Sequence, residues 1–219
     1  MPPDDVRASG PRSGVLVVGD ANPDLVLRGD VVPRFGQAEQ LLDEAALVVG
    51  GSAAITAHGL ARLGRPVFLV AAIGDDLFGE RLRGQLGEAG VDVDRVVVRP
   101  ELPTGLTVVL SRGADRAMLT HTGAIDSLTG SEVRTAVEDV GGRGVVHVHV
   151  ASLYLQPGLL AVLPDVLRAA QEAGLTTSVD TNDDPTGRWS GLDALLPHLD
   201  VLLPNRAEVT ALGQDSDPH

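Results

Sequence analysis

The chain has 219 residues, of which 43% are hydrophobic and 21% charged, and its formal net charge is −13. This composition is typical of a globular protein with a full core. The acidic surplus argues against nucleic acid as a partner, because phosphate binding needs a clustered basic surface. There is no cysteine, which excludes disulfides and thiol nucleophiles and fits a cytoplasmic location.

Lysine and long apolar segments are also absent from the sequence, and each absence excludes a class of function. Every basic side chain is arginine, so Schiff-base chemistry and the lysine of a Walker-type phosphate loop are excluded. Apolar runs stay shorter than a membrane span, so we expect no membrane association. We expect a disordered leader at 1–13, one α/β domain at 14–213 and a tail at 214–219.

Short β-branched runs alternate with helix-like stretches along the chain. In order, the pattern predicts a strand at 14–19, a helix at 52–63, a strand at 66–72, helices at 76–89 and 129–140, a strand at 145–150, a helix at 158–173, strands at 176–179 and 200–203, and a helix at 205–212. We expect Ser52 to cap the first helix, and Thr129 and Glu132 to form a capping box. This alternation indicates a mostly parallel sheet with helices on both faces.

Two segments interrupt the alternation. Residues 24–48 contain Pro33, Gly36 and short extended pieces, and residues 104–122 read as two strands joined at Arg112–Asp115. Antiparallel pieces inserted in an α/β chain often form a separate small sheet. Over the carboxyl edge of the main sheet, such a sheet would act as a lid.

Polar residues follow several of the predicted strands, at the edge where open α/β sheets bind ligands. Asn22 and Asp24 follow the first strand, and Asp180 and Asn182 follow the strand at 176–179. Asn205 and Glu208 open the last helix. Each group also has a purely structural interpretation, since Asp and Asn favour turns and Asn-x-x-Glu matches a capping box.

His147 and His149 alternate on one predicted strand and therefore share a face. A His-x-His strand also occurs in metal hydrolases, so metal-dependent hydrolysis is one alternative function. The remaining histidines lack ligand spacing.

Taken together, these features resemble the PfkB-type, ribokinase-like carbohydrate kinases, from about Val15 to Gly213. The most specific part is GGSAAITAHGLARLGRPVFLVAAIGDDLFG at 50–79, which is similar to the N-terminal signature of that family. The loop at 19–24 resembles its first sugar-binding loop. Asp180-x-Asn182 is similar to its Asp-Pro-Asn segment, and Asn205-x-x-Glu208 to its magnesium-associated motif.

The resemblance implies a three-layer α/β/α fold with a β-lid, and ATP- and Mg²⁺-dependent phosphorylation of a sugar or nucleoside hydroxyl. Asn22, Asp24, Gly50 and Gly51 would hold the sugar, with the glycines admitting it close to the backbone. The part of the site that takes the phosphate groups and Mg²⁺ would contain Asp180, Asn182, Asn205 and Glu208. Some members of that family pair through their lids, so the resemblance allows a homodimer.

The sequence departs from the family pattern in two places. Ile55 stands where the family carries an asparagine that contacts the substrate. The family also continues past Asn-x-x-Glu to a Gly-Ala-Gly-Asp segment with the catalytic base and a nucleotide pocket, which this sequence does not contain. We therefore expect little kinase activity from the chain alone. The alternative is a non-catalytic relative that binds a sugar or a partner.

Overall fold

The computed structural model describes residues 13–140 and 142–214. The predicted leader therefore lies outside the described residues except for Ser13, and the predicted tail except for Gln214. Within the described part, no helix is long and apolar enough to cross a membrane.

The body of the molecule is a parallel sheet. Its strands, in spatial order, are β11 (Val201–Leu202), β10 (Thr176–Val179), β9 (Val145–Val150), β1 (Gly14–Val18), β4 (Val67–Gly74) and β5 (Val91–Asp92), and β6 (Val96–Arg99) also pairs with β4. All of these pairs are parallel. Their carboxyl ends therefore meet at one edge, which confirms the predicted α/β class.

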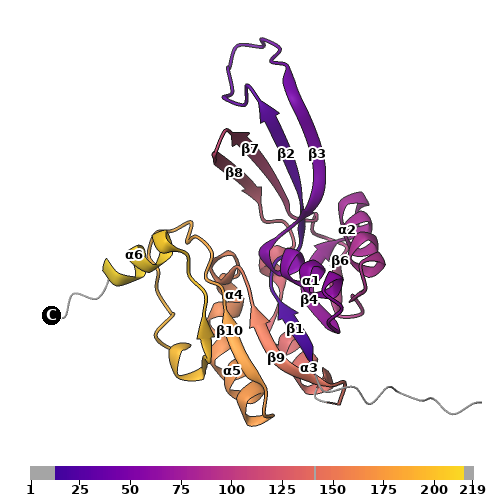
Figure 1. Ribbon diagram of the computed structural model, residues 1–219, viewed down its shortest axis with the longest axis vertical. Helices are drawn as coiled ribbons and strands as arrows, with labels where there is room; N and C mark the ends of the chain where they lie inside the picture. The colour runs from indigo at the N-terminus through magenta and orange to yellow at the C-terminus, as the bar shows by residue number, and fades with distance from the viewer. Residues whose placement is uncertain (1–12, 141, 215–219) are drawn as a thin grey trace, which may run out of the picture.

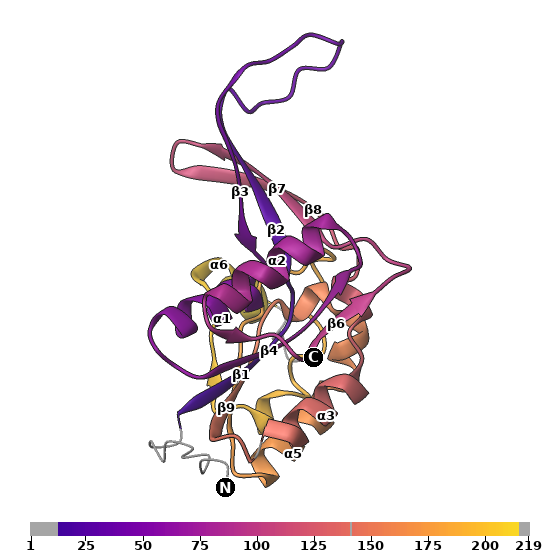
Figure 2. The same cartoon turned by 90° about the vertical axis from the view of Figure 1, so that its right-hand side faces the viewer.

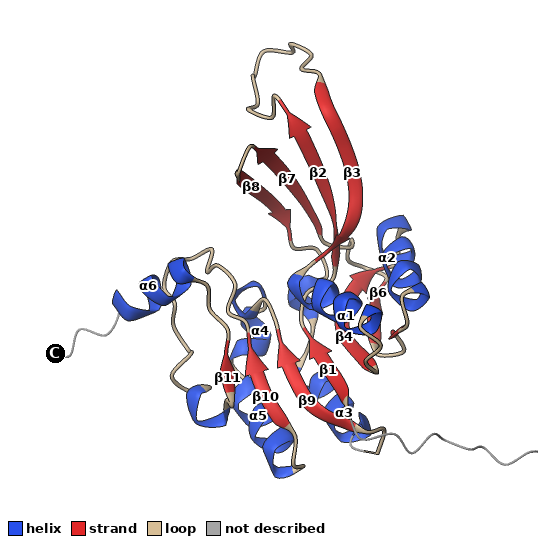
Figure 3. Ribbon diagram, in the orientation of Figure 1, coloured by secondary structure: helices blue, strands red, loops and turns tan. Residues whose placement is uncertain are grey.

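Helices lie on the two faces of this sheet, giving three layers (Figure 3). The described helices are α1 (Ser52–Arg62), α2 (Leu77–Glu88), α3 (Gly130–Val140), α4 (Pro157–Leu160), α5 (Leu163–Glu172) and α6 (Arg206–Gln214), with 3₁₀ turns at Ile125–Ser127, Leu153–Leu155 and Leu196–His198. Of these, α6 lies beyond the ends of β10 and β11 (Figure 1). Apolar side chains of α3 and α5 pack with one face of the sheet, and those of α1 and α2 pack with the other.

The second sheet has four strands and projects away from the body, as Figures 1 and 2 show. Its spatial order is β3 (Leu42–Gly50), β2 (Asn22–Gly29), β7 (Leu106–Arg112) and β8 (Asp115–His121). β2 pairs parallel with β7, and the two outer pairs are antiparallel. We call this sheet the lid. The strands of 104–122 join through Gly113 and Ala114, as the turn residues predicted.

Two predictions about the helices are wrong. The helix expected at 158–173 is divided into α4 and α5, and Pro164 occupies the first turn of α5. Proline has no N–H and is tolerated only in the first turn of a helix, so the chain restarts there. The N-cap of α1 is Gly51 rather than Ser52. Strands β5 and β6 were not anticipated.

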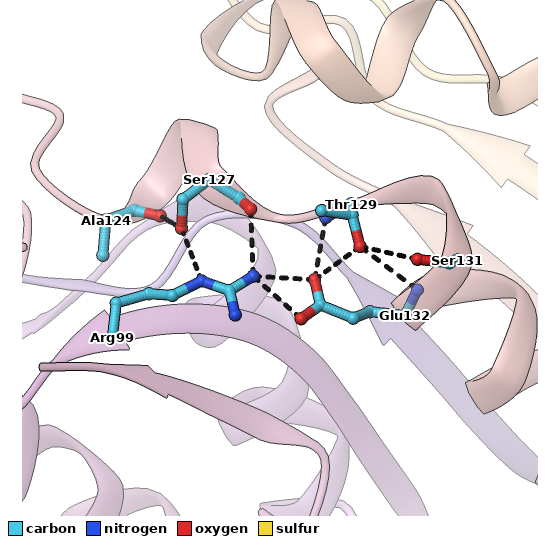
Figure 4. A network of polar contacts seen from close by, with 6 residues as sticks. All are labelled: Arg99, Ala124, Ser127, Thr129, Ser131 and Glu132. Carbon is cyan, nitrogen blue, oxygen red and sulfur yellow. Dashed lines mark hydrogen bonds and ion pairs between the residues drawn. The ribbon is translucent and has the colours of Figure 1, made fainter.

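A polar cluster joins β6 to the start of α3 (Figure 4). The Nη2 atom of Arg99 donates to both carboxylate oxygens of Glu132 at 2.8 Å and to the carbonyl of Ser127 at 3.0 Å. The backbone N–H of Thr129 donates to Glu132 at 2.9 Å, and the N–H of Glu132 donates back to Thr129 Oγ1 at 3.4 Å. The predicted capping box is confirmed, and Arg99 extends it to the sheet.

Candidate functional site

The first group of predicted site residues is brought together by strand pairing at the base of the lid. Asn22 and Asp24 lie on β2, and Asn22 pairs with Gly50 at the end of β3. Gly51 follows as the N-cap of α1. Asn22 is buried, while Asp24 is half-buried and therefore reachable from solvent. Asn22 and Asp24 are two positions apart on the strand, so their side chains share one face of the lid.

The glycine pair is required by the chain itself. A Cβ at Gly50 would overlap the carboxylate of Asp24. At Gly51, where φ is +81°, a Cβ would lie 2.7 Å from the carbonyl oxygen of Asp20 and 3.0 Å from Oδ1 of Asn22. These two positions therefore admit the side chains of Asn22 and Asp24. This reason for the glycines differs from the ligand contact that the sequence suggested.

Asp20 supplies the cap that α1 lacks in its own sequence. Its Oδ1 accepts the N–H of Ala53 at 3.0 Å, and its backbone carbonyl accepts the N–H of Ala54 at 3.2 Å. Burial raises the pKa of Asp20, and the hydrogen bonds from the Ala53 amide and the Ser152 hydroxyl act in the opposite sense. Asp20 therefore ties the loop after β1 to the start of α1.

Asp24 has a perturbed carboxyl group. Burial raises its pKa, a hydrogen bond from Asn22 lowers it, and the neighbouring Asp20 raises it again. Nδ2 of Asn22 donates to Oδ1 of Asp24 at 2.9 Å. A half-buried carboxylate held by an amide is well suited to accept hydrogen bonds from ligand hydroxyls.

The second group of predicted site residues lies where β10 and β11 end. Glu208 is buried, and its Oε2 accepts both the hydroxyl of Thr181 and the N–H of Asn205 at 2.9 Å. Nδ2 of Asn205 also donates to Oε1 of Glu208. Oδ1 of Asn205 accepts the N–H of Glu208 at 3.1 Å, which completes a capping box. The structural interpretation of Asn-x-x-Glu therefore applies.

Asp180 and Asn182 complete this group. Burial raises the pKa of Asp180, and the carboxylates of Glu208 and Asp20 raise it further. Asn182 has a left-handed backbone, with φ of +55°, and its Nδ2 donates to Oγ of Ser152 at 3.3 Å. The two groups thus share the carboxyl edge of the sheet, with Asp20 electrostatically close to both Asp24 and Asp180.

The oxygen atoms of the second site group decide whether a metal ion could bind there. Within residues 13–140 and 142–214, no three His, Cys, Asp or Glu side chains are placed to hold a metal directly. Both carboxylate oxygens of Glu208 already accept hydrogen bonds from Thr181 or Asn205. Mg²⁺ characteristically keeps several waters and uses few protein ligands. Among the described residues, Asp180 and Glu208 could therefore contact a hydrated Mg²⁺ only through its waters.

His147 and His149 do share a face, as predicted, but they contact hydroxyl groups. The ring of His147 lies 2.7 Å from Oγ1 of Thr176 and 2.7 Å from Oγ of Ser178, and Nδ1 of His149 lies 2.8 Å from the same Ser178 oxygen. Burial lowers the pKa of His149 to about 4, so it is neutral at pH 7. This arrangement gives metal-dependent hydrolysis no third ligand among the described residues.

Several residues at this edge were missed or left unassigned by sequence reasoning. Asp20 belongs to the loop at 19–24, in which only Asn22 and Asp24 were given a role, and Ser152 and Thr181 follow strands without forming any motif. Thr107 lies 85 positions from Asn22, whose Nδ2 donates to it at 3.2 Å. Only strand register shows that contact. Ile55, on the first turn of α1, is 51% exposed.

Comparison with known proteins places the chain in a family. The family model described as pfkB family carbohydrate kinase matches residues 12–218. An ATP-dependent ribose-1-phosphate kinase of Halopiger xanaduensis is 30% identical over 201 residues, which cover 92% of this chain and 64% of that protein.

Solved structures agree on the fold. A fructokinase of Xylella fastidiosa with bound ATP superimposes with a TM-score of 0.75 at 25% identity, covering 93% of this chain and 64% of that one. An E. coli structure described as a putative ribokinase II with ATP and Mg²⁺ gives a TM-score of 0.74 at 22% identity, covering 94% and 65%. The chain thus spans somewhat less than two thirds of these relatives. Since the family model matches nearly its whole length, the chain belongs to the pfkB family of carbohydrate kinases.

Proposed function

We propose that this chain forms the sugar-binding side of a kinase that transfers phosphate from ATP to a hydroxyl of a sugar or nucleoside. The observation that carries the proposal is the juxtaposition of Asn22, Asp24, Gly50 and Gly51 at the base of the lid. A half-buried carboxylate over a glycine pair offers acceptors to a polyhydroxyl ligand. Relatives named as ribose-1-phosphate kinase and ribokinase support this substrate class.

The roles of the residues follow from their positions. Asp24 would accept hydrogen bonds from sugar hydroxyls, and Oδ1 of Asn22, which lies toward Gly51, would accept another. Asp180 and Glu208 would hold the hydrated Mg²⁺, and Asn182 would lie beside them. When bound, Mg²⁺ offsets the charge on the transferred phosphoryl group. The lid would exclude water from the sugar.

Ile55 bears on which sugar is accepted. Half of this apolar side chain is exposed on the first turn of α1, three residues after Ser52. An isoleucine cannot form a hydrogen bond with a hydroxyl group. We infer that the preferred substrate is less polar at the point nearest to Ile55 than the substrate of relatives with asparagine there.

The 219-residue polypeptide has no Gly-Ala-Gly-Asp segment, so we infer that it binds a sugar but turns over little ATP alone. The experiment has two parts. Isothermal titration with a panel of pentoses, hexoses and nucleosides is expected to show saturable binding of at least one. An ADP-release assay on the same panel is expected to show little turnover. Turnover typical of a kinase, about 1–100 per second, would contradict the inferred inactivity.

We also propose that two copies pair through their lids. β8 is an edge strand of the lid, and its Met118 and Leu119 are 52% and 58% exposed. Exposed edge strands and apolar side chains favour pairing between chains. Size-exclusion chromatography with light scattering should give a dimer mass that falls to the monomer mass in Leu119→Lys.

A further inference from the structure

A row of polar side chains crosses one face of the lid and ends at the first site group. Thr107 on β7 lies directly opposite Asp24 on β2, and Thr120 on β8 lies directly opposite Thr107. Nδ2 of Asn22 donates to Oγ1 of Thr107 at 3.2 Å, and that oxygen lies 3.1 Å from Oγ1 of Thr120. Three lid strands are therefore joined through side chains beside Asp24.

The surroundings of Asn22 allow one orientation of its carboxamide. Nδ2 contacts the carbonyl oxygen of Pro23 at 3.1 Å and Oδ1 of Asp24 at 2.9 Å. A carbonyl oxygen can only accept a hydrogen bond, so the amide nitrogen of Asn22 must face Pro23 and, with it, Asp24. Together with Thr107 they make three acceptors for two N–H bonds, and none remains for a ligand. Thr107 is thus one of three groups that fix this amide.

We propose that Thr107 is a positioning residue for sugar binding: its hydroxyl fixes the Asn22 carboxamide, which in turn fixes the carboxylate of Asp24. The proposal rests on the proposed function, since the ligand of Asp24 is the sugar. Thr107 is only 3% exposed, so it acts on the sugar through Asn22 and the more accessible Asp24 rather than by direct contact. The affinity for sugar then depends on how β7 pairs with β2, although β7 is far from the glycine pair in the sequence.

The first test replaces the hydroxyl with a methyl group of the same size. Thr107→Val leaves Pro23 and Asp24 as acceptors for the two N–H bonds of Asn22 but removes the link between Asn22 and β7. Binding of the best sugar of the panel should therefore weaken about two- to fivefold in isothermal titration. Thr107→Ser retains the hydroxyl and should restore wild-type affinity. Wild-type affinity in Thr107→Val, or an equal loss in Thr107→Ser, would overturn the proposal.

Thr177 provides a matched control, because it is fully buried and donates its hydroxyl to the carbonyl of His198 at 2.7 Å. Thr177→Val should lower the melting temperature as Thr107→Val does. Thr177 lies on β10, outside the lid, and its hydroxyl bonds to His198 and Asp200, so the affinity for sugar should not change. Equal loss of affinity in both valine variants would show a general loss of structure and would overturn the positioning role.

A second readout does not need a sugar. In ¹⁵N NMR, the side-chain amide protons of Asn22 should exchange slowly with solvent in the wild-type chain and faster in Thr107→Val. If no sugar in the panel binds the wild type, the proposed function fails, while faster exchange in Thr107→Val would still establish the hold on Asn22. Unchanged exchange at Asn22 would overturn the proposal whether or not a sugar binds.

Discussion

The two halves of the central sheet differ in how they are covered. Around β4 both faces are packed, since all eight residues of that strand are buried between α1 and α2 on one side and α3 on the other. Around β10, α5 covers one face, and in Figure 1 no described helix lies over the other. That second face carries His147, His149 and Ser178 and borders a cavity of about 420 Å³.

The difference shows in the strand sequences. β4 reads VFLVAAIG, an unbroken apolar run typical of a parallel strand buried on both faces. β9 reads VVHVHV, in which apolar and polar residues alternate, and β10 reads TTSV, in which three of the four residues are polar. Val201 and Leu203, around β11, are 44% and 50% exposed. The first site group follows β1, in the half of the sheet that is covered on both faces. The second site group follows β10 and β11, in the half that the described helices cover on one face only.

The largest expected effect concerns the covered half. Gly50→Ala places a Cβ on the Asp24 carboxylate and should weaken sugar binding about 10- to 100-fold, because hydrogen bonds to charged groups contribute about 1.5–3 kcal/mol. Titration calorimetry measures this loss. Gly59→Ala is the control, since a Cβ there meets no heavy atom within 4 Å. If Gly50→Ala binds sugar like Gly59→Ala, the glycine pair does not serve the site.

The next effect is a dependence of stability on pH that arises from His149, in the half of the sheet with one uncovered face. Burial holds the pKa of His149 at about 4, whereas the unfolded chain takes up this proton near pH 6.5. The unfolded state therefore binds more protons between these values, and the free energy of unfolding falls as the pH drops from 6.5 to 4, by at most about 3 kcal/mol. Urea unfolding at several pH values measures this loss.

Because carboxylates also titrate in this range, the decisive quantity is the difference between variants. His149→Leu should show a shallower pH dependence than the wild type, and His121→Gln, which removes an exposed imidazole, should not. Equal slopes in the wild type and His149→Leu would mean that the histidines of the bare face are not buried in the neutral form.

A smaller effect is expected from Ile55→Asn. An amide at this exposed position of α1 adds one hydrogen-bonding group beside the first site group, so affinity for a fully hydroxylated sugar should rise about three- to tenfold. The same titrations as for Gly50→Ala give the answer. Unchanged affinities across the panel would place Ile55 away from the substrate.

The smallest effect on sugar binding is expected from a change in Glu132, at the start of α3. Burial alone would raise the pKa of Glu132, but hydrogen bonds from Thr129 and Arg99 lower it. Glu132→Gln should cost about 1 kcal/mol of unfolding free energy, typical of a helix cap, and leave sugar affinity unchanged. A change in affinity would show that the sugar site depends on this cluster.

The sequence predicted the parts of this molecule that depend on local pattern. The strands β1, β9 and β10 and the cap at Thr129 follow from runs of a few residues. The residues that hold Asn22 and Glu208 did not follow, because Thr107 and Thr181 reach them only through strand register and loop placement. The split between α4 and α5 was missed because the helix expected at 158–173 ran through Pro164, which instead lies in the first turn of α5.

The most direct test of the account is an NMR titration of the ¹⁵N-labelled chain with the best sugar of the panel. The largest shifts of backbone amide signals are predicted at Asp24, Gly50 and Gly51, at the base of the lid. The wild-type pattern should disappear in Asp24→Asn at the same sugar concentration. Shifts concentrated on β9 and β10, around His149 and Ser178, would place the ligand on the bare face and contradict the account.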